Sequence, residues 1–162
     1  MLNVGERCPL CADGRLERRA PEHEITIGGI RVTDKTTMVL VCGSCSETFV
    51  TAEQRQGYER RAVATILRER TQVPGSVVRV ARKWLGLTQK DLAALMETSA
   101  ETVSRWENDH LAIPRAEQLA IVALLDGVAH GQVDLASALE AARSSRPPQL
   151  TELQVTAKTE AA

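Results

Sequence analysis

The chain has 162 residues, of which 43% are apolar and 2% aromatic, and its formal net charge is −1. This charge excludes nucleic-acid binding through an overall basic surface, so any such binding has to come from locally placed Arg and Lys side chains. The chain has no apolar run of about 18 residues, and its start, MLNVGERC, lacks the apolar stretch of a secretion signal, so we expect a cytoplasmic protein with no membrane partner.

All four cysteines lie in two CxxC pairs, CPLC at 8–11 and CGSC at 42–45. Disulfides are disfavoured because thiols stay reduced in the cytoplasm. The gap within each pair lets both thiolates point into one tetrahedron, and two such pairs complete a four-sulfur site that suits Zn²⁺. We predict one structural zinc ion per chain, with iron in the same cage left open. The ligands are Cys8, Cys11, Cys42 and Cys45.

Residues 24–41, EITIGGIRVTDKTTMVLV, separate the two pairs and alternate as strands do. Two alternating runs flank Gly28-Gly29, which predicts a hairpin. A second reversal at Asp34-Lys35 leads into a third strand that ends at Cys42. We therefore predict a small antiparallel sheet with the two knuckles at one end, which is a zinc ribbon. Bound zinc supplies roughly 10–16 kcal/mol to the folding of such small units.

A helix is expected after the second knuckle, because Thr51 and Gln54 have the spacing of a capping box. Apolar residues from Tyr58 to Leu67 share one face of this helix, and arginines surround the rest. The arginine face is either simply solvated or a surface for a partner or for the DNA backbone. Pro74-Gly75 ends the pattern and marks a linker, so residues 1–72 are predicted to be a zinc-ribbon domain with a connecting helix.

The following residues, 73–143, carry helical periodicity without any strand pattern. Thr88 and Ser99 are N-cap candidates for two short helices, and the tight turn between them contains Glu97 where a glycine is usual. Two short helices joined in this way form a helix-turn-helix. If Glu97 adopts a positive φ, the strain costs on the order of 1 kcal/mol.

Two further helices are predicted at 114–129 and 133–143, rich in Leu, Ala, Ile and Val. Part of this apolar surface exceeds the needs of one small domain, and we assign it to a homodimer. Residues 144–162 contain prolines and no periodicity, and are predicted to be a flexible tail. The predicted fold class is therefore α+β: an N-terminal zinc ribbon, then an all-α helix-turn-helix domain for DNA binding and dimerisation.

The segments GLTQKDLA and VSRWEN resemble the Cro/phage-repressor, or XRE, family of DNA-binding domains. The order of the two halves makes the whole chain similar to the MqsA/YgiT family. This resemblance implies an antitoxin of a type II toxin–antitoxin pair that represses its own operon, with the toxin bound by the N-terminal domain. A stand-alone regulator without a toxin, whose ribbon binds another protein or senses a signal, is the alternative.

In a helix-turn-helix, the start of the second helix meets base edges in the major groove of double-stranded DNA. The resemblance to phage repressors assigns base reading to Ala100, Glu101 and Arg105, and a buried ion pair to Arg82 and Glu107. Arg105 suits guanine, whereas Glu101 either accepts from cytosine or only complements the helix dipole. The full set of predicted DNA contacts is Thr88, Gln89, Ser99, Ala100, Glu101, Thr102, Arg105 and Asn108.

One short recognition helix contacts few base pairs, so useful specificity needs a homodimer on a palindromic operator. An enzyme or electron-transfer module is the competing class. Four thiolates close a zinc site to water, and the three histidines are scattered along the chain, so we expect no catalytic activity.

Overall fold

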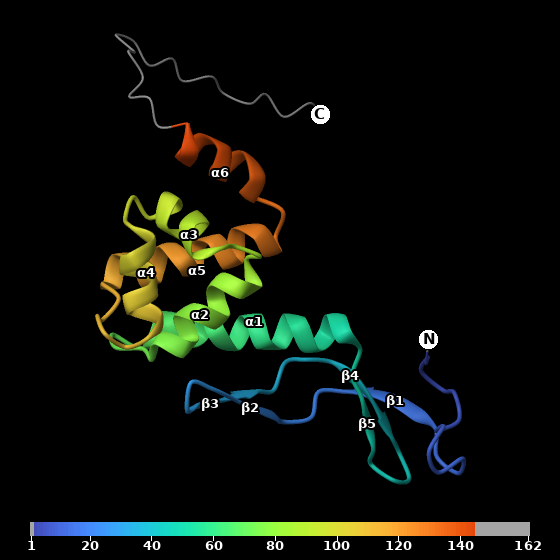
Figure 1. The fold of residues 1–162 in the computed structure, drawn as a ribbon. Helices are drawn as coiled ribbons and strands as arrows, with labels where there is room; N and C mark the ends of the chain where they lie inside the picture. The colour runs from blue at the N-terminus through green and yellow to red at the C-terminus, as the bar shows by residue number, and fades with distance from the viewer. Residues whose placement is uncertain (1, 145–162) are drawn as a thin grey trace.

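The computed structural model describes residues 2–144, so the predicted tail lies outside the described residues except for Ser144. Within that range strands come first and helices follow, which confirms the predicted α+β class (Figure 1). The strands are β1 (Leu16–Arg19), β2 (His23–Ile27), β3 (Ile30–Asp34), β4 (Val39–Cys42) and β5 (Thr48–Phe49). The helices are α1 (Ala52–Glu69), α2 (Gly75–Trp84), α3 (Gln89–Leu95), α4 (Ala100–Glu107), α5 (Arg115–Ala129) and α6 (Leu135–Arg143).

The strands form two sheets, where the sequence predicted one. The hairpin of β2 and β3 is present, but β4 does not join it and pairs instead with β1 and β5. The prediction missed β1 because only Leu16 of its four residues is buried, and it missed β5 because that strand has two residues. Asp34 sets the break after the hairpin, since its carboxylate accepts hydrogen bonds from Thr36 and Thr37 and turns the chain away.

Helix α1 lies between the strands and the other helices (Figure 1). Its predicted capping box is present: Gln54 N donates to Thr51 Oγ1 at 3.1 Å, and Thr51 N donates to Gln54 Oε1 at 2.9 Å. Its buried face joins the same hydrophobic cluster as Ile27 of the hairpin and Leu125 of α5. The apolar face predicted for this helix therefore packs on both sides, against the hairpin and against α2 and α5.

Arg115, the first residue of α5, fastens the end of α1 to the helical half. Its guanidinium donates to the backbone carbonyls of Leu67 at 2.6 Å, Arg68 at 2.5 Å and Arg70 at 2.9 Å. The last carbonyls of a helix have no partner within the helix, so a cation placed there satisfies them and complements the helix dipole.

The junction at Pro74-Gly75, which the sequence marked as a linker, is closely packed. Gly75 is buried, and a Cβ added to it would collide with the backbone of Trp106 and Glu107. Its backbone N–H donates to Asp109 Oδ1 at 2.6 Å. The domain boundary at residue 72 stays a prediction, and the hydrophobic cluster extends across it.

The helix-turn-helix consists of α3 and α4. Thr88 and Asp91 form a capping box at the start of α3, and the Ser99 side chain accepts from Thr102 N at the start of α4. Glu97 in the turn between the helices has a φ of 49°, the positive value expected for this position. Leu92, Ala93, Val103 and Trp106 are buried where the two helices and their neighbours meet.

Candidate metal centre and nucleic-acid interface

The four cysteines meet at one end of the sheet formed by β1, β4 and β5. Cys8 and Cys11 belong to the loop before β1, while Cys42 ends β4 and Cys45 lies in the turn toward β5. Their four Sγ atoms lie within 4.8 Å of one another, and none of the thiols is in a disulfide. Gly14 makes this approach possible, because a Cβ at that position would overlap Cys42 Sγ.

The spacing of the sulfurs fits a tetrahedral metal ion. A tetrahedron with metal–sulfur bonds of about 2.3 Å has edges of about 3.8 Å. Cys8 Sγ lies 3.8 Å from Cys45 Sγ, and Cys11 Sγ lies 3.6 Å from Cys42 Sγ. Four thiolates are a soft donor set, which suits zinc or iron and not magnesium or calcium. Among residues 2–144, this is the one group of three or more His, Cys, Asp or Glu side chains arranged to hold a metal.

Backbone amides of the knuckles point at the sulfurs, as expected for thiolates. Leu10 N donates to Cys8 Sγ at 3.4 Å, and Ser44 N donates to Cys42 Sγ at the same distance. The N–H groups of Cys45 and Ser44 lower the pKa of Cys42 to about 6. The Cys45 thiol receives the N–H of Glu47, which lowers its pKa, but the neighbouring thiols and burial raise it to about 12. Because the thiolate and not the thiol binds metal, metal binding at this site releases protons.

Two side chains that the sequence assigned to an ion pair are indeed paired beside the helix-turn-helix. Arg82 of α2 donates to Glu107 at 2.5 and 3.0 Å, and the Glu107 side chain is 1% exposed. Burial raises the pKa of Glu107, but hydrogen bonds from Arg82 and Gln89 outweigh it, so the pKa lies below its ordinary value. The pair links α2 to the end of α4 and so fixes the recognition helix.

The outer face of α4 carries Glu101 and Arg105, two of the three positions to which the resemblance assigned base reading. Glu101 and Arg105 are both exposed and lie one helical turn apart, so they share a face. Neither side chain makes a hydrogen bond or ion pair with another residue of 2–144. Ala100 and Thr102 are half-buried at the start of the helix, and Ser99 is exposed at its N-cap. This arrangement leaves the start of α4 free to enter a groove.

Three other predicted contacts are engaged within the protein. Thr88 caps α3, Gln89 Nε2 donates to Glu107 Oε2 at 2.9 Å, and Asn108 Nδ2 donates to Ser104 O at 2.8 Å. A phosphate bound by the Gln89 amide would have to compete with Glu107 for it. The role of each of the eight residues in DNA binding stays a prediction.

Arg79 of α2 was not singled out from the sequence, although its side chain contacts the end of the recognition helix α4. Its guanidinium donates to Glu107 O at 2.9 Å and to Asn108 Oδ1 at 2.7 Å. No local sequence signal reveals this residue, because its partners are far away along the chain. Its side chain is 42% exposed and adds a cation beside α4.

Comparison with known proteins agrees with this geometry. Residues 78–131 match the HTH_3 helix-turn-helix family. Among curated proteins, none matches the sequence significantly. The matched segment runs from α2 into the residues after α5 and includes both helices of the motif. The chain therefore carries an XRE-type helix-turn-helix, the domain with which transcription regulators bind double-stranded DNA. None of the described helices is long and apolar enough to cross a membrane.

Proposed function

We propose that this protein is a dimeric, sequence-specific transcriptional repressor that acts in the cytoplasm. The observation that carries the proposal is the exposed face of α4, where Glu101 and Arg105 point outward from a helix-turn-helix with no partner among residues 2–144. A long cation in this position has no packing role, and guanine offers it two acceptors in the major groove.

A homodimer on a palindromic operator is part of the proposal. The exposed large apolar side chains of the helical half lie in or just before α5, and they are Leu111, Leu119 and Val128, each 40–44% exposed. Exposed apolar side chains in this part of the chain support a partner surface there, and a second copy provides the second recognition helix that specificity needs.

We propose further that the protein is the antitoxin of a type II pair and represses its own operon. This rests on the resemblance of the whole chain to the MqsA/YgiT family, and on the order of the cysteine cage and the helix-turn-helix. The alternative is a regulator without a toxin, whose ribbon binds another protein or senses a signal. If the neighbouring gene encodes a small toxin that co-purifies with this protein, the first version is supported; if not, the alternative is.

The metal is proposed to be one structural zinc per chain, bound by Cys8, Cys11, Cys42 and Cys45. Four thiolates complete the tetrahedron and leave no position for a substrate or for water, so we propose no enzymatic activity. Elemental analysis of the purified protein distinguishes zinc from iron.

Arg105→Ala tests the proposed function, with DNA from upstream of the protein's own gene and a scrambled duplex as ligands at two salt concentrations. If Arg105 binds guanine, the change costs roughly 1–3 kcal/mol on the cognate site and little on scrambled DNA. If Arg105 binds phosphate, both affinities fall and the salt slope drops by about one unit. Arg7→Ala, on the exposed surface of the ribbon, is the matched control. Unchanged affinities on both duplexes would overturn the assignment of α4 as the DNA reader.

A further inference from the structure

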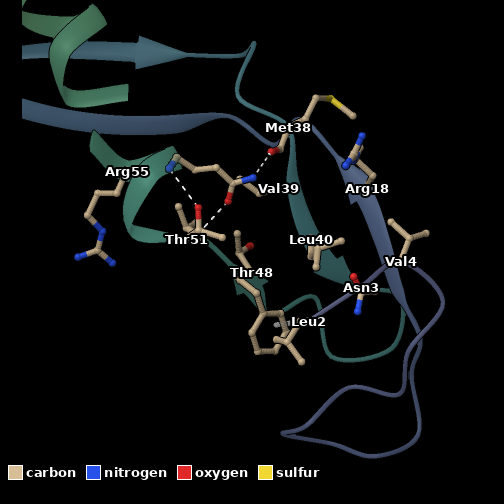
Figure 2. A pocket seen from close by; sticks show the side chains of 13 residues that line it. Leu2, Asn3, Val4, Arg18, Met38, Val39, Leu40, Thr48, Thr51 and Arg55 are labelled. Atoms are coloured by element: carbon tan, nitrogen blue, oxygen red, sulfur yellow. Dashed lines mark hydrogen bonds between the residues drawn. The ribbon is translucent and has the colours of Figure 1, made fainter. Parts of the chain in front are cut away.

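The two sheets of the N-terminal half have different surroundings. A groove of about 690 Å³ lies against the sheet of β1, β4 and β5, and its other walls come from the N-terminal segment and the start of α1 (Figure 2). The β2–β3 hairpin contributes no residue to this groove. The hairpin packs along α1, and its closed end meets the start of α2 (Figure 1). A part of the predicted ribbon therefore touches the helix that precedes the helix-turn-helix.

The alternation of the hairpin turns one of its faces toward the helices. The residues on this face pack in the helical cluster, and they are Ile25, Ile27, Ile30 and Val32. The same cluster contains Val77 of α2 and Trp106 of α4. Because side chains alternate between the two faces of a strand, a slip of one residue would turn the whole apolar row to solvent. The cluster therefore fixes where the hairpin lies.

The closed end of the hairpin contacts α2 through Gly28. This residue has a φ of 57°, and a Cβ built on it would lie 2.6 Å from Ser76 Oγ and 2.9 Å from Val77 Cγ2. The Val77 side chain is fully buried, so it cannot move aside freely. Gly29 has a φ of 76°, but a Cβ there would meet no atom within 4 Å. Both glycines suit the backbone of the turn, and of the two, Gly28 alone is also needed for contact with a neighbour.

The part of α2 that Gly28 touches supports the end of α4. Gly75, the first residue of α2, lies so close to α4 that a Cβ there would overlap Trp106 O and the carbonyl carbon of Glu107. Arg79, one turn further along α2, donates to Glu107 O at 2.9 Å. Backbones packed this closely leave no room for independent movement. A displacement of the start of α2 therefore displaces the end of α4.

We propose that the β2–β3 hairpin positions the recognition helix, and that Gly28 is the positioning residue at the contact. The hairpin supports the start of α2, the start of α2 supports the end of α4, and α4 presents Glu101 and Arg105 to DNA. Hydrogen bonds to base edges need their side chains held within about 0.5 Å, so base reading depends on this support. Non-specific binding depends on charge and tolerates small displacements. The effect on DNA rests on the proposed function, whereas the positioning of α4 does not.

The test compares Gly28→Ala with Gly29→Ala in the full-length, zinc-loaded protein. Both variants place a Cβ at a positive φ and carry similar backbone strain, but only Gly28→Ala brings the Cβ against α2. Affinities are titrated for DNA from upstream of the protein's own gene and for a scrambled duplex, after circular dichroism has confirmed that each variant is folded. Ser76→Leu reaches the same contact from α2 at a helical φ, and it replaces Gly28→Ala in every comparison if that variant does not fold.

The indole N–H of Trp106 reports the position of α4 independently of DNA. Its Nε1 atom is buried and has no hydrogen-bond partner among residues 2–144, so its NMR resonance responds to packing around the helix. Trp84→Phe removes the resonance of the other tryptophan and so assigns the two signals. The resonance should shift in Gly28→Ala and stay in place in Gly29→Ala.

We expect Gly28→Ala to weaken binding to the upstream duplex by about threefold to tenfold and binding to the scrambled duplex by less than about twofold. Gly29→Ala should change neither affinity by more than about twofold. The proposal is overturned if Gly28→Ala keeps the parent affinity for the upstream duplex, if Gly29→Ala has the same effect, or if both affinities fall alike, as a loss of folded protein would cause. A parent protein that does not prefer the upstream duplex contradicts the proposed function, and the Trp106 resonance alone then decides whether the hairpin positions α4.

Discussion

The cluster around the cysteines is small, with Cys8, Leu16 and Cys42 as its buried members, whereas the helical cluster extends from Ile27 of the hairpin to Leu125 of α5. A unit as small as the first buries too little apolar surface to fold by burial alone. The proposed zinc would supply the difference through its bonds to sulfur, while the second cluster depends on packing. The boundary between the two kinds of stabilisation is not the boundary between strands and helices, because the β2–β3 hairpin and α1 belong to the packed cluster.

The largest effect that separates the two regions is expected from loss of the metal. Cys42→Ser removes one ligand, and with it most of the roughly 10–16 kcal/mol that structural zinc supplies. Hydrogen exchange should become fast in β1, β4 and β5, while the β2–β3 hairpin and the helices stay protected, because they pack on α1. Leu10→Ser, an exposed change within the first knuckle, should keep zinc and protection. Simultaneous unfolding of the hairpin with β4 would show that the hairpin does not depend on the packed cluster.

A core substitution in α1 tests whether this helix stabilises the helical half. Leu67 is fully buried and belongs to the cluster shared with α2 and α5, so Leu67→Ala should destabilise the helical half by about 2–5 kcal/mol. Urea unfolding followed by helical circular dichroism measures this loss, and the zinc content should not change. Thr65→Ala, at an exposed position of the same helix, is the control. An unchanged midpoint for Leu67→Ala would show that residues 73–143 fold independently of α1.

Acid should weaken the packed region through two carboxylates. Burial raises the pKa of Asp34, but hydrogen bonds from Thr36, Thr37 and Arg61 outweigh it and hold the pKa well below its usual range. The pKa of Glu107 is lowered as described above. Because both folded pKa values lie below the unfolded ones, the stabilisation is present above about pH 4–5 and is lost as pH falls toward the folded values. Asp34→Asn should therefore flatten the decline in thermal midpoint between about pH 5 and pH 3, and an unaltered pH profile would contradict this.

The smallest effects are expected in the turn and caps of the helix-turn-helix. Ser99→Ala removes the cap of α4 and should cost about 1 kcal/mol. Glu97 is held at a φ of 49°, a value that glycine adopts at little cost, so Glu97→Gly should remove strain of about 1 kcal/mol or less and stabilise the fold. The two variants should shift the thermal midpoint in opposite directions, so a double variant close to the parent protein is the check. A lower midpoint for Glu97→Gly would show that the contacts of the Glu97 side chain stabilise the fold by more than its backbone strain destabilises it.

Local signals in the sequence were enough to predict the cage, the helix caps and the helix-turn-helix. These signals join residues that are close in the sequence, so a single sequence reveals them. They are the CxxC pairs and the capping boxes of Thr51 with Gln54 and of Thr88 with Asp91. Pairings between distant residues were not predictable in the same way. The partner of β4 depends on β1, whose exposed arginines give no alternation, and the contacts of Arg79 and Arg115 join residues far apart in the chain. The groove was missed for the same reason, since three strands and the N-terminal segment build it together.

The packing of α1 against α2 and α5 has a consequence for recombining this protein with others. A chimera that exchanges the ribbon at residue 72 keeps a foreign α1 beside α2 and α5, so its interface is mismatched from the outset. Arg115 would then face carbonyls of a helix with which it did not evolve. Crossover points before Thr51, where the chain leaves β5 and enters α1, keep α1 with the helices on which it packs. The segment that can be exchanged therefore ends before α1 and is shorter than the predicted ribbon domain. Its β2–β3 hairpin has to fit the α1 that is retained, because the two pack together.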